Sequence, residues 1–258
     1  MKPSSFFFVL GFTVAAQAAA LAFTLQLAGL ADLISFEPVQ GAQAPVFNAV
    51  IFLTLPILGS LIYLKFRHLP LLKYAYALAE ALLVAFLSFL VLVFSDYDIL
   101  LAGLLSFAVG SIGLAVLIYG RGASRTAFSL LLSSEAGAYL ALVFKPPTIY
   151  VVLLLFALYD VFAVFKGPLR KVVADPSFGA LSVDFGSISM GMGDEIFYAM
   201  VPSAAYLIRG PLAAVAIIAI IDAGVAITLL LLSRRRALPG LTLPLLFSLA
   251  YFAVLAVV

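Results

Sequence analysis

The chain lacks cysteine and tryptophan, contains a single histidine, and has few charged residues, only 10% of its 258 residues. The absence of cysteine excludes disulfides and thiol chemistry. A soluble domain carries about 25% charged residues, whereas here hydrophobic residues reach 66%. Apolar stretches of about 20 residues, the length that spans a bilayer, recur along the whole sequence. We therefore expect a polytopic α-helical membrane protein.

The scarcity of histidine narrows the possible chemistry. His68 lies in the basic loop 65–70, where it is simplest to regard it as a residue facing lipid headgroups. A zinc protease would need an H-E-x-x-H motif, and a serine hydrolase would need a histidine beside a buried serine. A haem site would lack its ligand. Any catalysis is therefore expected to depend on carboxylates, with no metal or other cofactor. A net charge of +2 gives no argument for a nucleic-acid partner.

Hydrophobic runs and the charged, proline or glycine residues between them predict an all-α protein with nine transmembrane helices in one domain, residues 1–258. The first apolar run, of about 25 residues, exceeds the roughly 7–15 of a signal peptide, so we expect it to be retained. The seventh and ninth spans have weaker signals because both contain proline, and the seventh also contains two acids. The predicted spans are Ser5–Leu30, Val46–Leu64, Leu71–Phe94, Ile99–Tyr119, Thr126–Phe144, Ile149–Phe165, Ser189–Ile208, Pro211–Leu232 and Leu241–Val258.

Lysine and arginine predict the orientation of these spans, because cytoplasmic loops carry an excess of both. If the N-terminus is inside and the nine spans alternate, the outer segments hold only Lys145 and Arg209. The other twelve of the fourteen basic residues lie inside: Lys2, Lys65, Arg67, Lys73, Arg121, Arg125, Lys166, Arg170, Lys171, Arg234, Arg235 and Arg236. We expect a cytoplasmic N-terminus and a C-terminus outside.

Carboxylates within the spans are the candidate functional groups, because an ionisable group is costly inside a membrane. Asp160 lies about 9 Å from the inner end of the sixth span, and Asp194 lies about 8 Å from the inner end of the seventh. No other pair of acids on neighbouring spans matches in depth as closely. Two carboxyls in contact share one proton and can activate a water molecule. The alternative is that each aspartate pairs with an arginine or with backbone groups.

The residues near this pair have their own expected roles. Gly191 and Gly193 would let another backbone approach closely, although they could also serve only to pack helices. We expect Glu195, about 100° away from Asp194 on a helix, to have a packing or polar-cavity role. Three further acids are expected to form interhelical hydrogen bonds rather than join the pair: Glu80, Glu135 and Asp222.

Three motifs occur in order in spans six, seven and nine. They are Leu158-Tyr159-Asp160-Val161 running into Lys166-Gly167-Pro168-Leu169-Arg170, then Gly191-Met192-Gly193-Asp194, then Pro239-Gly240-Leu241. These motifs resemble those of the presenilin and signal peptide peptidase family of intramembrane aspartyl proteases. That family carries Tyr-Asp, Gly-x-Gly-Asp and Pro-Ala-Leu at these places, so the present chain departs from it at Gly240.

The resemblance implies a protease that cleaves single transmembrane helices of other proteins, with its catalytic core in residues 149–258. It implies that Asp160 and Asp194 are catalytic. The residues implied to surround the substrate are Tyr159, Gly191, Met192, Gly193, Pro239, Gly240 and Leu241. The predicted orientation favours the presenilin side of the family. The short connection after the sixth span lacks the long insertion of animal presenilins, which argues against self-cleavage and favours a prokaryotic cell membrane.

One further expectation concerns substrate binding, and two other functions remain open. Residues 182–185 could pair with an unwound substrate strand by β-augmentation. A proton-coupled secondary transporter could use the same carboxylates as a relay, although no internal repeat is detectable. A prepilin-type peptidase shares Gly-x-Gly-Asp but is not expected to carry the other two motifs. Nothing in the sequence requires an accessory subunit or fixes the oligomeric state.

Overall fold

The computed structural model describes residues 3–31, 43–66, 68–69, 71–120, 122–166, 182–185, 188–233 and 238–257. These residues form nine α-helices, one 3₁₀ turn and a two-stranded hairpin. The first half contains α1 (Pro3–Leu27), η1 (Ala28–Leu30), α3 (Ala44–Phe66), α4 (Leu71–Phe94), α5 (Ile99–Tyr119) and α6 (Ala123–Val143). The second half contains α7 (Pro146–Phe165), β1 (Ser182–Asp184), β2 (Ser189–Gly191), α9 (Met192–Arg209), α10 (Pro211–Leu232) and α11 (Thr242–Val257).

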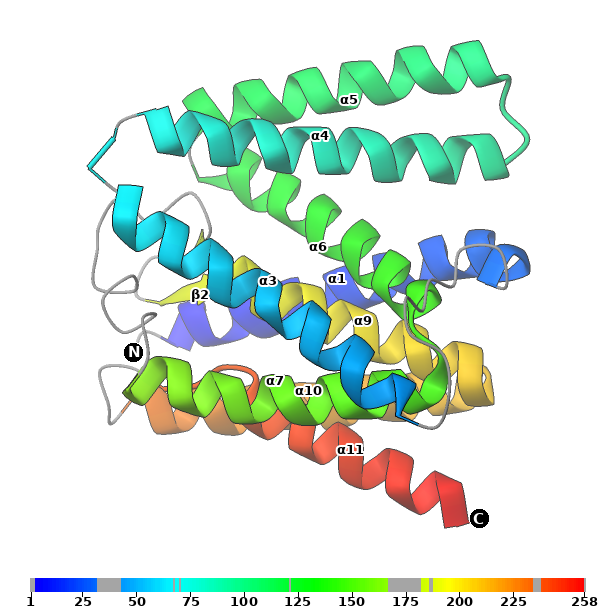
Figure 1. Ribbon diagram of the computed structural model, residues 1–258, viewed down its shortest axis with the longest axis vertical. Helices are drawn as coiled ribbons and strands as arrows, with labels where there is room; N and C mark the ends of the chain where they lie inside the picture. Colours follow the sequence, from blue (N-terminus) through cyan, green and yellow to red (C-terminus); the bar gives the residue numbers. More distant parts are fainter. Residues whose placement is uncertain are drawn as a thin grey trace.

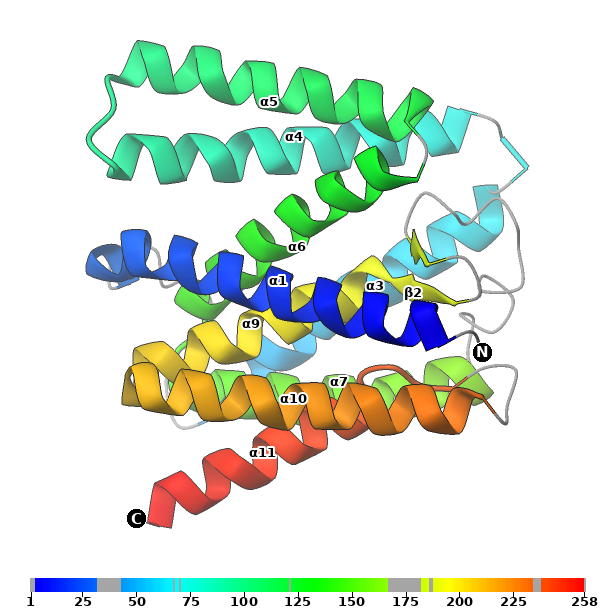
Figure 2. The same ribbon diagram turned by 180° about the vertical axis from the view of Figure 1, so that it is seen from behind.

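The helices run across the molecule in roughly the same direction or its reverse, and α9 lies among them near the centre (Figure 1). It packs against α1, α6, α10 and α7. The α4–α5 hairpin forms one edge and α11 forms the opposite edge, as Figure 2 shows from behind. The start of α1 and the end of α11 lie on opposite sides of this helical layer (Figure 1). The central position of α9 allows residues from several helices to reach it.

Local sequence signals explain where several helices begin and end. The Asp98 side chain accepts hydrogen bonds from the backbone N–H groups of Leu100 and Leu101, which caps α5. Prolines occupy the first turns of α7 and α10, where the missing N–H costs nothing. Gly210 joins α9 to α10 with φ of 83°, a conformation that suits glycine. These signals place α4, α5 and α10 at the predicted bounds, and every other helix starts and ends within three residues of its prediction.

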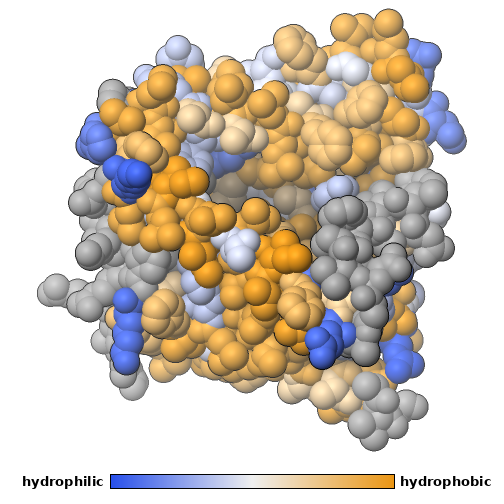
Figure 3. All heavy atoms as spheres, in the orientation of Figure 1, coloured by the Kyte–Doolittle hydropathy of each residue, from blue (hydrophilic) through white to orange (hydrophobic). Residues whose placement is uncertain are grey.

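Seven of the described helices are long and apolar enough to cross a membrane. The exceptions are α9 and α11, the two predicted spans with the weakest signals. Apolar residues cover a broad band of the surface, while hydrophilic residues gather toward its two edges (Figure 3). An integral multi-pass membrane protein is therefore the architecture that the structure supports, and the number nine stays a prediction.

The predicted start of the seventh span at Ser189 is wrong, because residues 189–191 form strand β2. This strand pairs antiparallel with β1, with Val183 opposite Met190, and both of these side chains are buried. The hairpin is held on α1, since the Ser5 hydroxyl donates to the Phe185 carbonyl over 2.9 Å. Pairing and burial thus outweigh helix formation next to a glycine. The all-α prediction holds apart from this hairpin.

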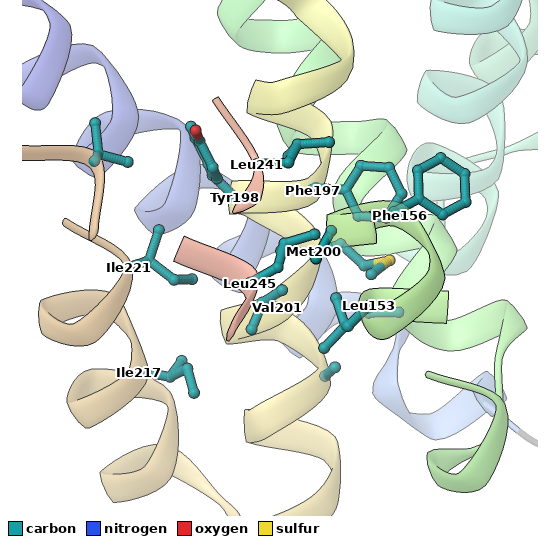
Figure 4. Packing of buried hydrophobic residues seen from close by; sticks show 14 of the residues in the cluster. Leu153, Phe156, Phe197, Tyr198, Met200, Val201, Ile217, Ile221, Leu241 and Leu245 are labelled. Atoms are coloured by element: carbon teal, nitrogen blue, oxygen red, sulfur yellow. The ribbon is translucent and has the colours of Figure 1, made fainter. Parts of the chain in front are cut away.

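The core lies between α7, α9, α10 and α11. Phe156 of α7 stacks in a tilted arrangement on Phe197 of α9, with ring centroids 4.4 Å apart. Figure 4 shows Leu153 and Met200 near this contact, and Val201, Leu245, Ile217 and Ile221 continuing the same cluster toward α10. Two glycines allow the helices to approach closely. A Cβ at Gly137 would lie 2.6 Å from the Ala199 Cβ, and one at Gly224 would lie 2.7 Å from the Pro244 Cα.

Candidate active site

Asp160 lies in the last turns of α7 and contacts the start of α11. Its Oδ2 atom accepts hydrogen bonds from the backbone N–H of Leu241 at 2.7 Å and of Thr242 at 3.2 Å. The Thr242 hydroxyl lies 3.4 Å from the same oxygen. The first N–H groups of a helix lack partners within the helix. The Asp160 carboxyl therefore caps α11 from another helix, and α11 in turn fixes the carboxyl.

Asp194 lies in the first turn of α9 and reaches the same segment from the other side. Its carboxyl lies so close to Gly240 that a Cβ there would overlap Oδ2. It is also close enough to Asp160 for the two carboxyls to interact electrostatically. Residues 240–242 thus bring together the two aspartates that the sequence pairs, and the predicted contact between spans six and seven is present.

The helix that carries Asp194 starts later than the predicted seventh span. Because α9 begins at Met192, Asp194 lies about 3 Å from the helix start rather than about 8 Å. The residues before it belong to the hairpin. The segment before α11 contacts both carboxyls.

Two residues that sequence reasoning missed complete this arrangement. The Tyr198 hydroxyl donates to the Gly240 carbonyl over 2.8 Å, and it lies close to Asp194. The Thr242 hydroxyl lies 3.2 Å from the Ala157 carbonyl as well as near Asp160. Tyr198 follows Asp194 by four residues, one helical turn, so their spacing was a usable signal. Thr242 directly follows the third motif, but its side chain gave no separate signal.

The three predicted site residues that precede Asp194 have different surroundings. Gly191 ends β2, and a Cβ there would lie 3.6 Å from the Asp194 Oδ2. Gly193 is exposed, and a Cβ there would meet nothing within 4 Å. The Met192 side chain is buried in a hydrophobic cluster with Phe128 and Leu132. Its predicted contact with substrate therefore has no support from its surroundings.

Tyr159 and the third motif lie around the same carboxyls. Tyr159 is half-buried and packs edge-on against Phe156, with ring centroids 6.5 Å apart. Its hydroxyl has no partner within 3.5 Å among the described residues, although the Ser60 side chain of α3 lies near it. Pro239 is half-buried and Leu241 is buried. Residues 167–170 of the first motif lie outside the described part of the chain.

The other intramembrane acids mostly follow the expectation of interhelical bonding. Ser88 donates to Glu135 over 2.8 Å, and the Gln17 amide donates to Asp222 over 3.4 Å. Glu80 differs, since neither of its carboxyl oxygens has a hydrogen-bond partner among the described residues, although Arg125 lies near enough to attract it. Within the described part of the chain, no group of three or more histidine, aspartate or glutamate side chains could hold a metal ion.

Comparisons with known proteins extend the resemblance to the whole fold. No protein-family model and no curated protein sequence matches the chain. The structure is similar to a presenilin family intramembrane aspartate protease solved in a C222 crystal form, with a TM-score of 0.73 and 15% identity over 98% of both chains. A second such structure, in a P2 crystal form, has a TM-score of 0.68 and 17% identity over 96% of both chains. The chain therefore has the fold of presenilin family proteases, as its motifs predicted.

Proposed function

We propose that the chain is an intramembrane aspartyl endopeptidase that hydrolyses peptide bonds within transmembrane segments of single-span proteins. The observation that carries this proposal is the meeting of Asp160 and Asp194 at residues 240–242. The solved structures with the same fold are described as intramembrane aspartate proteases. No other pair of acids among the described residues both contacts one shared segment and belongs to the Tyr-Asp and Gly-x-Gly-Asp motifs.

In the proposed reaction, the two aspartates hold a water molecule between them. One carboxylate takes a proton from the water while the water oxygen bonds to the peptide carbonyl carbon. The other carboxyl gives its proton to the carbonyl oxygen, which yields a tetrahedral diol. The C–N bond then breaks as the first aspartate gives the proton that it took to the leaving nitrogen, while the second aspartate takes a proton from a diol hydroxyl, which restores the starting state of the pair.

The surroundings of the pair would admit an unwound substrate segment. Unwound backbone at membrane depth is tolerated only where protein or water satisfies its polar groups. Exposed Gly193 leaves space beside Asp194, and the β1–β2 hairpin lies directly before α9. Tyr159, Pro239, Gly240 and Leu241 are the other residues that we assign to the substrate side. Nine spans, a cytoplasmic N-terminus and a catalytic centre facing the cytoplasm of a prokaryotic cell belong to the same proposal.

The test is cleavage of a single-span type I membrane peptide by the purified protein in detergent, with products identified by mass spectrometry. Asp160→Asn and Asp194→Asn keep the size of the side chains. The amide oxygen of Asp160→Asn can still accept hydrogen bonds from the start of α11. We expect cleavage within the hydrophobic segment by the wild type and none by either variant. Glu135→Gln is the matched control, because this carboxyl is also buried and hydrogen-bonded but lies on another helix pair, α4 and α6.

Two outcomes would contradict the proposal. Cleavage that survives in either Asn variant would overturn the assignment of the pair. Absence of cleavage across a panel of single-span peptides, together with proton-coupled uptake in vesicles that is lost in both variants, would favour the transporter instead.

A further inference from the structure

The two aspartates are held in different ways. Asp160 is fixed directly by two backbone N–H donors, Leu241 and Thr242, with the Thr242 hydroxyl nearby. No hydrogen bond to the Asp194 carboxyl is found among the described residues; the glycines at 191 and 240 lie against it, and the Tyr198 hydroxyl and the Asp160 carboxyl are near. The direction of Asp194 therefore depends on where the first turn of α9 lies.

That first turn is attached to α1 at the next residue, Glu195. Its side chain is fully buried, and its Oε1 atom lies 3.1 Å from the Thr13 hydroxyl, which also lies 3.1 Å from the Val9 carbonyl. One turn further along the same face of α1, the Gln17 amide lies 3.4 Å from the Asp222 Oδ1. Helix α1 thus links α9 to α10 through polar contacts within an otherwise apolar interface.

We propose that Thr13, Gln17, Glu195 and Asp222, the α1 polar cluster, hold the first turn of α9 in place and so position Asp194 toward Asp160. Glu195 and Thr13 are positioning residues in this cluster, not catalytic ones. The inference rests on the proposed function for its kinetic consequence, but the position of the turn can be measured without it.

The α1 polar cluster is expected to contribute little to the free energy of unfolding. Its effect on the position of Asp194 can therefore be tested in a folded protein. The Oε2 atom of Glu195 and the Oε1 atom of Gln17 are buried and have no hydrogen-bond partner among the described residues. Replacing a buried polar group of this kind by an apolar one of similar size is often neutral for stability. Glu195→Leu removes the link to α1 and leaves the Thr13 hydroxyl the Val9 carbonyl as an acceptor, and adding Thr13→Val replaces both partners by apolar groups.

A matched control exists elsewhere in the molecule. Glu135 of α6 is also buried, accepts one hydroxyl hydrogen bond from another helix, and leaves its Oε2 atom unpartnered among the described residues. It differs from Glu195 in that it does not adjoin Asp194. Glu135→Leu therefore reproduces the chemical change of Glu195→Leu without loosening the first turn of α9.

The kinetic experiment compares Glu195→Leu, Glu195→Gln and Thr13→Val with this control. Misplacing a reacting group by about 1 Å can cost about 100-fold in rate. We expect Glu195→Leu and Thr13→Val to lower kcat at least about tenfold with KM nearly unchanged. Glu195→Gln should retain kcat, because an amide can bond the Thr13 hydroxyl in either direction. The double variant of Glu195→Leu and Thr13→Val should be no slower than the slower single variant.

A second readout reports on the turn itself. The chain has no cysteine, so Gly193→Cys provides one exposed thiol beside Asp194. We expect a water-soluble maleimide to label this thiol at a several-fold altered rate in Glu195→Leu and Thr13→Val, and at the unaltered rate in Glu195→Gln and Glu135→Leu. If neither the wild type nor any variant cleaves substrate but the labelling follows this pattern, the proposed protease function fails, and the proposal that the α1 polar cluster positions Asp194 stands. Unaltered labelling in both Glu195→Leu and Thr13→Val, or an equal loss of kcat in Glu135→Leu, would overturn the positioning.

Discussion

At Gly240, the absence of a Cβ atom leaves the space that the Asp194 carboxyl occupies. The presenilin and signal peptide peptidase family, whose motifs those of this chain resemble, carries alanine at this place, whereas here the Asp194 carboxyl fills the space that an alanine Cβ would need. The Gly240 carbonyl also accepts the hydrogen bond from Tyr198. The position of Asp194 and the absence of a side chain at residue 240 are thus two aspects of one contact.

Gly240→Ala should therefore displace the Asp194 carboxyl. We expect kcat to fall at least about tenfold, because the reacting group moves relative to Asp160, while the midpoint of thermal unfolding changes little. Gly103→Ala in α5 is the control, because a Cβ there meets nothing within 4 Å. Peptide cleavage at saturating substrate measures the effect. Unchanged kcat in Gly240→Ala would show that Asp194 can act from another rotamer.

Tyr198→Phe removes one hydrogen bond from the segment before α11. The lost bond to Gly240 should lower the free energy of unfolding by about 1 kcal/mol, and we expect kcat to fall because the segment contacts both aspartates. Thermal unfolding in detergent and peptide cleavage measure the two effects. A loss of stability without any change in kcat would limit Tyr198 to a packing role.

At the scale of elements, α9 is the helix on which the site depends. It carries Asp194, Glu195 and Tyr198, and it packs against α6 so tightly that Gly137 has no room for a side chain. A Cβ at Gly137 would lie 2.8 Å from the backbone nitrogen of Met200. Backbone cannot give way as a flexible side chain can, so α6 fixes how far α9 can shift.

Gly137→Ala tests this packing. Overfilling a tight interface costs about 1–3 kcal/mol, and we expect the midpoint of thermal unfolding to fall accordingly. Gly59→Ala in α3 is the control: a Cβ there meets nothing within 4 Å, so the better helix propensity of alanine should leave stability equal or slightly higher. Equal midpoints for the two variants would mean that α6 and α9 can move apart without cost.

The elements also show which features the sequence could predict. Helices α4, α5 and α10 have their predicted bounds because charged residues, prolines or glycines interrupt the apolar runs. The start of α9 was missed, since strand β2 forms only through pairing with β1. The contact between Thr13 and Glu195 could not be predicted either, because apolar residues surround α1 nearly evenly and do not reveal which of its faces is buried.

In the whole molecule, the candidate site lies near one side of the helical layer. The end of α7, the β1–β2 hairpin and the starts of α9 and α11 all lie on the side where α1 begins (Figure 1). The positive-inside rule predicts that this side faces the cytoplasm. Helix α9 lies within the layer beside helices that are long and apolar enough to span, and it buries most of its side chains, whereas α11 lies at the edge and is the shortest of the described α-helices. A helix enclosed by others needs less apolar surface of its own than one that faces lipid.

Single cysteines can test this topology, because the chain has none of its own. Asp96, Lys145, Lys166 and Ser233 are exposed at the ends of helices. With nine alternating spans, an impermeant maleimide should label Asp96→Cys and Lys145→Cys in intact cells, and Lys166→Cys and Ser233→Cys only after permeabilisation. A cysteine appended after residue 258 should be labelled in intact cells. Ser233→Cys is decisive for α9, because α10 would otherwise end outside and the thiol would react without permeabilisation. Such reaction would contradict the nine-span topology, and Asp194 would then not lie on a membrane-crossing helix.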